Sequence, residues 1–447
     1  MKNKIAIVYI AHDGFTSLYT GVGTVARDFL LTWKYVKKEL KNKFKETEFD
    51  FYPTTIKYKT GCFGYSESYR DEILKYINGE SAIYLTELLN DSAGMESYST
   101  IANWNAASIS AATFLKSLVN KYSYVIAITV DTPFAQVANK FFEVYDDNNI
   151  QIIWLPQSTV KVHKYGKSSD KTTIGKSYED IRFEWEKGPV SLANKHKQVY
   201  IGFTSHFMKN HLIKEYGAIN KKLISIQNSL DFNRLMNNLK SQNYIKQLLV
   251  NKGVPIDKPL IFTFGRAELY KGIDILLKSA KDITQNHKYY ILVITSPYTK
   301  NDPYLKELYK LSSQYPKDIK IITGLDFITP HYILQWHQTK ILALFSRAEP
   351  FGLIPIEARF YNNKSLVVLT SNLGGFVDQI TNGKDGFLTN LDKKSIKLSF
   401  KTISNLKNKE INKISTNGYN RVIKNFDMKT INVQLFTRII SKIINEK

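Results

Sequence analysis

Short apolar runs with strand character alternate with helical stretches along this entire 447-residue chain, and that alternation limits the fold more than any other feature. It is typical of parallel β-sheets that carry helices on both faces, so we expect an α/β protein. The length exceeds one ordinary core, and polar turn residues at 227–233 and 251–259 favour a boundary between two domains. The predicted strands are 5–10, 49–52, 82–85, 124–128, 152–155, 199–203, 260–264, 290–294, 319–322, 341–345 and 365–369.

Composition narrows the class of protein. The hydrophobic content of 43% and the charged content of 23% are those of a globular chain. No apolar run approaches the roughly 20 residues that a membrane-spanning helix requires. The N-terminal apolar run ends at His12 and Asp13 without a small-residue cleavage site, so we interpret it as a buried strand and not as a signal peptide. Because the single cysteine, Cys62, cannot form an internal disulfide and no Cys/His cluster has zinc spacing, we expect a cytoplasmic protein without a metal site.

The chain is strongly basic, with a formal charge of +22 from 62 Lys and Arg against 40 Asp and Glu. Such an excess attracts anions, namely nucleic acid, anionic membranes or phosphorylated substrates. The basic residues are spread along the chain and no nucleic-acid motif occurs, so we expect no nucleic-acid partner. Residues 22–45 predict a basic amphipathic helix, which either packs its apolar side on its own sheet or makes peripheral contact with an anionic membrane.

A glycine-rich loop opens that helix. Residues 21–26 match G-x-G-x-x-A, the dinucleotide-binding fingerprint, through Gly21 and Gly23. The fingerprint should follow its strand directly, whereas residues 11–20 intervene here, so we predict no dinucleotide cofactor. The loop either lets backbone approach a substrate or a phosphate, or forms a plain tight turn.

Polar residues also follow two other predicted strands of the first half. Asp131 comes after the strand 124–128, and Gln157 comes after the strand 152–155. Side chains at the carboxyl ends of strands line the crevice in which open α/β sheets bind ligands. Asp131 and Gln157 are therefore candidate ligand-contacting residues.

In the second half, the stretch 346–358 places two carboxylates around a strand-to-helix turn. Pro350 and Gly352 break off the strand, Glu349 lies on the turn, and Glu357 lies one to two turns into the next helix. The helix start offers N–H groups that suit a phosphate or another anion. This pattern predicts a clamp for a sugar nucleotide, with the carboxylates taking sugar and ribose hydroxyls; the alternative is an acidic turn with a solvated helix glutamate.

Two cations and a pair of glycines occupy further strand-to-helix turns. Arg266 and Lys271 share one loop and could grip a diphosphate, with Arg as a fork and Lys as a point charge. The alternative is a pair of solvated surface cations. Gly374 and Gly375 lie on another turn, where backbone N–H groups could reach the same phosphate.

Together these blocks resemble the retaining GT-B glycosyltransferases of the "group 1" family, glycosyltransferase family four. The resemblance implies two facing Rossmann-like domains, residues 1–232 for the acceptor and 233–427 for the nucleotide-sugar donor. Residues 428–447 would form a helix that crosses back and packs on the first domain. The blocks that carry the resemblance are Gly265-Arg266, Lys271-Gly272, 349–353, Glu357-Ala358 and Gly374-Gly375.

The resemblance also implies a reaction. A hexose-type sugar would pass from a UDP- or GDP-sugar to a hydroxyl of a glycan, lipid-linked or small-molecule acceptor, with retention and without a metal or other cofactor. Arg266 and Lys271 would hold the donor diphosphate, Glu349 would contact the donor sugar, and Glu357 would contact the ribose. The other predicted donor contacts are Gly21, Gly23, Phe351, Gly352, Leu353, Gly374 and Gly375.

One departure from the family lies on the acceptor side. The family usually has a histidine at the strand end where Gln157 stands, and a glutamine can hydrogen-bond a sugar hydroxyl but cannot titrate. His12 or His163 could replace it, so we predict His12, Asp131 and Gln157 as acceptor-side residues. Two alternatives stay open: a GT-B sugar-nucleotide epimerase or phosphorylase-like enzyme, and a catalytically degenerate GT-B scaffold protein.

Overall fold

The computed structural model describes residues 3–17, 20–58, 65–78, 80, 82–88, 100–165, 176–284, 288–296, 302–324 and 326–445. The chain divides into two compact units. Unit 1 contains the described parts of 1–161, 171–231 and 427–447, and unit 2 contains those of 162–170 and 232–426. Cys62 lies outside the described residues.

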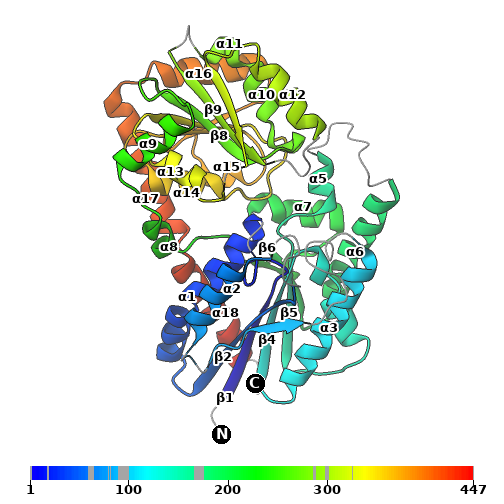
Figure 1. Ribbon diagram of the computed structural model, residues 1–447. Coiled ribbons are helices and arrows are strands. Elements are labelled where there is room, and N and C mark those ends of the chain that lie inside the picture. Colours follow the sequence, from blue (N-terminus) through cyan, green and yellow to red (C-terminus); the bar gives the residue numbers. More distant parts are fainter. Residues whose placement is uncertain are drawn as a thin grey trace. The chain divides into compact units, whose positions relative to one another are not determined.

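Unit 1 is built on a parallel seven-stranded sheet in the order β3-β2-β1-β4-β5-β6-β7 (Figure 1). The strands are β1 Asn3–Ile10, β2 Thr47–Ile56, β3 Thr86–Leu88, β4 Tyr124–Val130, β5 Ile150–Leu155, β6 Val199–Phe203 and β7 Leu223–Ser225. The α-helices are α1 Gly21–Lys43, α2 Glu67–Ile77, α3 Ile101–Val119, α4 Val137–Phe142, α6 Lys176–Lys195, α7 His206–Tyr216 and α18 Met428–Asn445. Helix α5, Val160–Tyr165, begins in unit 1, and its residues from Val162 onward are assigned to unit 2.

The central strand β1 serves two cores, because successive strand residues point to opposite faces of the sheet. Ala6, Val8 and Ile10 belong to a core that includes apolar side chains of α3 and α6. On the other face Tyr9 meets Phe29 of α1, with ring centroids 4.4 Å apart. Figure 1 shows α3 and α6 on one side of this sheet and α1 and α18 on the other.

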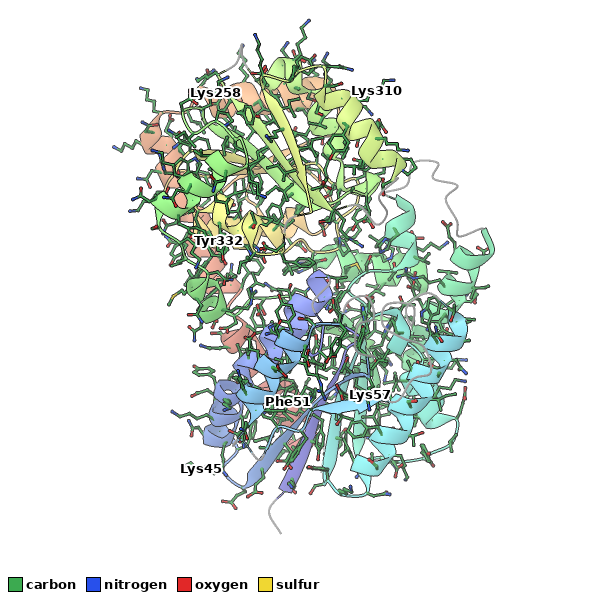
Figure 2. The ribbon with its side chains drawn as sticks, viewed as in Figure 1. Lys45, Phe51, Lys57, Lys258, Lys310 and Tyr332 are labelled. Carbon is green, nitrogen blue, oxygen red and sulfur yellow. The ribbon has the colours of Figure 1, made fainter. Side chains whose placement is uncertain are left out.

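The last helix, α18, completes the second core of unit 1. Phe436 is fully buried and lies edge-to-face against Phe29 and Trp33 of α1, at 5.9 and 6.1 Å. Trp33 in turn stacks on Phe51 of β2, with ring centroids 4.5 Å apart. Figure 2 labels Phe51 in this unit. The apolar side of α1 is therefore buried within unit 1, which favours sheet packing over membrane contact for this helix.

Unit 2 has a parallel six-stranded sheet in the order β10-β9-β8-β11-β12-β13. The strands are β8 Leu260–Arg266, β9 Tyr290–Ser296, β10 Ile319–Thr323, β11 Thr339–Leu344, β12 Val367–Ser371 and β13 Phe387–Thr389. The α-helices are α8 Phe232–Asn237, α9 Gln242–Asn251, α10 Ile273–Lys278, α11 Ala280–Ile283, α12 Pro303–Ser312, α13 Thr329–Leu334, α14 Ile354–Tyr361, α15 Phe376–Gln379, α16 Lys393–Ser404 and α17 Asn408–Asn425.

The predicted α/β class with two parallel sheets is confirmed. The predicted strand 82–85 is wrong: it is a turn with one isolated bridge from Ile83 to Phe51, and β3 begins later because it pairs with the last residues of β2. The sequence does not predict β7 and β13, which have three residues each and so show no apolar run. None of the described helices is long and apolar enough to cross a membrane.

Candidate active site

The predicted donor residues of the second half gather at one edge of the unit 2 sheet. Open α/β sheets bind ligands at the carboxyl ends of strands, at the point where the strand order reverses. In unit 2 the order reverses between β8 and β11, which are paired neighbours. The loops that follow β8, β11 and β12 carry the three predicted blocks, so the topology alone brings these blocks together.

An ion pair joins the first two blocks. Lys271 Nζ lies 2.9 Å from Glu349 Oε2, and the two side chains are only 21% and 11% exposed. Burial opposes the charge on Lys271, but the Glu349 carboxylate outweighs it and raises the pKa of the lysine. Lys271 therefore stays a cation at the site.

A glycine makes this pair possible. Lys271 ends a 3₁₀ turn, Leu269–Lys271, and the next residue, Gly272, has φ +67°. A Cβ at Gly272 would lie 1.8 Å from the carbonyl oxygen of Phe345, just beyond β11. Only glycine lets the loop pass this close to β11 and deliver Lys271 to Glu349.

Arg266 lies on the same loop but points elsewhere. Its Nη2 donates to the hydroxyl of Tyr270 at 2.6 Å, and its Nη1 lies 3.2 Å from Glu268. About a third of its side chain, 34%, is exposed. Tyr270 thus contacts both predicted phosphate-binding cations, since Lys271 Nζ also lies 4.8 Å from its ring centroid. The guanidinium keeps an exposed face for a further partner.

The Glu349 turn and the double-glycine turn form one unit. The N–H of Gly375 donates to the carbonyl oxygen of Glu349 at 2.8 Å. A Cβ at Gly374 would lie 2.2 Å from that same oxygen, and a Cβ at Gly375 would lie 2.4 Å from the Cα of Phe351. Both glycines are therefore required for the close approach of two backbones, and the turn also uses Gly352 at φ +87°.

Glu357 is buried in the first turn of α14, which begins after Leu353 and has no side-chain cap. Its Oε2 lies 3.4 Å from Nε2 of His331 on α13. Burial would raise the pKa of Glu357, but His331 overcomes this and lowers it, so the carboxylate is ionised. Sequence reasoning missed His331, because nothing in the local sequence of α13 links it to α14.

A second ion pair that the sequence does not predict fixes the loop carrying Lys271. Arg347 donates through both Nη atoms to the buried Asp274, at 2.8 and 2.7 Å. Its Nη1 also donates to the carbonyl oxygen of Leu269 at 2.5 Å. The backbone N–H of Arg347 donates to the carbonyl oxygen of Tyr270 at 2.6 Å. Arg347 therefore ties the 3₁₀ turn after β8 to the turn after β11. Arg347 lies two residues before Glu349 in the sequence, and this position is the signal that could have suggested its structural role.

In unit 1, the three predicted acceptor-side residues lie along one sheet edge. His12, Asp131 and Gln157 follow β1, β4 and β5, which are adjacent and parallel. Asp131 has φ +67°, the one positive φ outside glycine in the described part of the chain. Such strain is typical of functional sites. Gln157 accepts a hydrogen bond from Asn228 at 2.6 Å, and its buried Nε2 has no partner among the described residues.

The glycine loop of unit 1 is organised by a carboxylate. Asp13 is fully buried and accepts from the N–H and the hydroxyl of Thr20, at 2.8 and 2.9 Å. Thr20 caps α1 by accepting from the N–H of Gly23. A Cβ at Gly23 would lie 2.4 Å from Asp13 Oδ2, so this glycine is needed for packing. Asp13 thus lies against the start of α1, at the loop for which we left open either an approach to a substrate or phosphate or a plain tight turn.

The fully buried Glu186 of α6 supports the turn after β4. Its carboxylate accepts from the hydroxyls of Thr132 and Tyr216, from Arg182, and from the N–H of Val160. Thr132 directly follows the strained Asp131, so Glu186 holds the backbone at this end of β4. The sequence shows Glu186 only as one charge in a polar helix. Among the described residues, no three His, Cys, Asp or Glu side chains could together hold a metal ion.

One segment of the chain matches a known protein family. Residues 246–421 match the family described as "Glycosyl transferases group 1". Granule-bound starch synthase 1 of wheat (Triticum aestivum) is 25% identical over 182 residues, which is 39% of this chain and 28% of that protein. The maize (Zea mays) protein of the same name is 27% identical over 137 residues, 30% of this chain and 22% of that protein. The matched segment thus spans less than a third of these curated relatives.

Solved structures share the fold over nearly the whole chain. A sucrose-phosphate synthase from Thermosynechococcus elongatus has a TM-score of 0.69 at 16% identity, with 100% of both chains covered. Alr3699/HepE of Anabaena, solved in complex with UDP and glucose, has a TM-score of 0.65 at 15% identity, covering 98% of this chain and 99% of its own. At such identities the likeness establishes the GT-B fold.

Proposed function

We propose that this protein, whose residues 246–421 match the family of group 1 glycosyl transferases, is a retaining glycosyltransferase that moves a hexose-type sugar from a UDP- or GDP-sugar to a hydroxyl acceptor. The observation that carries the proposal is the Lys271–Glu349 pair, held 2.9 Å apart at the strand-order reversal of unit 2. A cation for phosphate and a carboxylate for sugar hydroxyls meet there, beside Arg266.

The cations would stabilise the departing diphosphate. Negative charge grows on the diphosphate as the bond to the sugar breaks, and charges already in place stabilise it without reorganisation. Lys271 would act as a point charge and Arg266 would fork onto two oxygens. We propose that these two cations suffice and that no metal is needed.

The carboxylates would bind the neutral parts of the donor. Glu349, held by Lys271, would accept from hydroxyls of the transferred sugar, while Glu357 would accept from the ribose. Backbone N–H groups of 351–353 and of Gly374 and Gly375 would add contacts to sugar and phosphate. UDP is the first nucleotide to test, because solved structures of this fold contain it.

The acceptor would bind on the unit 1 side, where His12, Asp131 and Gln157 share a sheet edge. For retention, we propose that a leaving phosphate oxygen helps to take the proton of the acceptor hydroxyl, so that no protein nucleophile is required. Gln157 would then orient the acceptor by hydrogen bonding. The acceptor itself is to be sought among glycans, lipid-linked sugars and small molecules.

Thermal unfolding with UDP, GDP, ADP and NAD tests the donor assignment. A ligand at 100 times its dissociation constant adds about 2.7 kcal/mol, which is a clear shift in Tm. We expect UDP or GDP to stabilise the protein without added metal, and Lys271→Ala to remove the effect. Lys310→Ala, an exposed lysine of α12 (Figure 2), is the charge-matched control and should keep it. Stabilisation by NAD alone would contradict the proposal.

Turnover separates the remaining alternatives. Glu349→Gln keeps the size of the side chain but removes its charge, so we expect the nucleotide to bind while transfer falls by about 10²–10³-fold. Product analysis distinguishes transfer from an epimerised or phosphorolysed sugar. A wild-type protein that binds the nucleotide sugar and never turns it over would support the scaffold alternative.

A further inference from the structure

Glu357 has an unusually simple environment for a buried carboxylate. Its Oε2 faces Nε2 of His331 at 3.4 Å. A carboxylate removed from water is costly unless it is paired. Arg234 of α8 also lowers the pKa of Glu357, so the group is ionised and can only accept hydrogen bonds. Nε2 of His331 must therefore be the donor.

The imidazole of His331 is held in one orientation. Its ring lies 5.6 Å from that of Tyr361 on α14 and, edge-to-face, 6.2 Å from that of Phe264 on β8. Its Nδ1 is buried and has no hydrogen-bond partner among the described residues. The start of α13 is itself fixed by Asp326, which accepts from the N–H of Thr329 at 2.8 Å. The ring is therefore aimed at Glu357 by packing and not by a second hydrogen bond.

We propose that His331 is a positioning residue that holds Glu357 for the vicinal diol of the donor ribose and so selects ribonucleotides over 2′-deoxyribonucleotides. The inference rests on the proposed function, in which Glu357 contacts the ribose. With Oε2 held by His331, Oε1 is fixed in direction and left to accept from the ribose hydroxyls. A buried acceptor positioned for a hydroxyl rejects an analogue that lacks it, because the acceptor is then left unpaired.

Binding of matched nucleotide pairs to the full chain tests this assignment. The probes are UDP and 2′-deoxy-UDP, together with GDP and 2′-deoxy-GDP, measured by calorimetry. We expect the wild type to prefer the ribonucleotide by about 10- to 100-fold. His331→Phe keeps a ring between Phe264 and Tyr361 but removes the donor, so the preference should fall to within about threefold. His331→Gln supplies an N–H near the place of Nε2 and should restore most of it.

Two controls make the outcomes distinct. Lys271→Ala should weaken the ribo and deoxy nucleotides equally, because it acts on the phosphates and leaves their ratio unchanged. Unfolding without ligand checks that each His331 variant is folded. Wild-type preference that persists in folded His331→Phe overturns the role of His331 alone. If the wild type binds none of the four nucleotides, the proposed donor site fails and this inference fails with it.

Discussion

At the scale of single residues, the site depends on backbone positions that only glycine can occupy. The Lys271–Glu349 pair is partly buried, so desolvation offsets much of its attraction and it adds little to stability. Its value is chemical, since it keeps a cation and a carboxylate ready at one point. Gly272 provides that geometry by allowing φ +67° against the carbonyl oxygen of Phe345.

Gly272→Ala tests this dependence. The new Cβ would lie 1.8 Å from the Phe345 oxygen and would also require a left-handed backbone. We expect a loss of about 2–4 kcal/mol in the free energy of unfolding, from backbone strain and overpacking together. We also expect nucleotide-induced stabilisation to disappear, because Lys271 is displaced.

Gly217→Ala is the matched control. Gly217 ends α7 at φ +73°, with nothing within 4 Å of an added Cβ. An alanine at this position has the strain of a left-handed backbone but no steric clash. We therefore expect the free energy of unfolding to fall by about 1 kcal/mol and nucleotide binding to be unchanged. Equal effects of the two substitutions would show that the contact with Phe345 is unimportant.

At the scale of elements, the pair of Arg347 and Asp274 joins the loop after β8 to the turn after β11. Burial alone would raise the pKa of Asp274, but hydrogen bonds from Arg347, Lys278 and Tyr304 lower it to about 2. A carboxylate whose pKa is lowered by folding stabilises the folded state at pH values above its ordinary pKa, which is near 4. That stability is lost as the pH falls through the window from about 4 to about 2.

Asp274→Asn should therefore weaken unit 2 in a pH-dependent way. We expect the difference in the free energy of unfolding between wild type and variant to be about 1 kcal/mol larger at pH 5 than at pH 3. Urea unfolding at the two pH values measures it. Asp257→Asn removes an exposed carboxylate of the same unit and should show no such change. A difference independent of pH would mean that Asp274 does not titrate in this window.

The same elements show how far the sequence can be read. Glu349, Lys271 and the double glycine could be predicted, because each lies at a strand-to-helix turn with a recognisable local pattern. His331, Asp274 and Glu186 could not, because each acts on a partner far away in the chain and looks like an ordinary helix residue. The local strand signal likewise fails for β7 and β13, which owe their existence to a paired neighbour.

At the scale of the whole molecule, residues 232–426 form most of unit 2, and the chain returns to unit 1 at Asp427. The return delivers α18, whose Phe436 fills the core between Phe29 and Trp33. Helix α18, which follows unit 2 in the chain, thus contributes to the core of unit 1. The proposed donor residues all lie in unit 2, apart from the Gly21 and Gly23 loop, so the two units can be perturbed separately.

Phe436→Ala should destabilise unit 1 and spare the donor site. Replacing a fully buried phenylalanine by alanine lowers the free energy of unfolding by about 3–5 kcal/mol. Tryptophan fluorescence can follow unit 1, because four of the five tryptophans lie in it: 33, 104, 154 and 185. We expect an early fluorescence transition in urea, while the affinity for UDP, measured calorimetrically under native conditions, changes less than about twofold. Ile444→Ala alters an exposed position of the same helix and should leave both unchanged. If Phe436→Ala instead abolished UDP binding in the folded protein, donor binding would depend on unit 1, and the assignment of the donor site to unit 2 alone would fail.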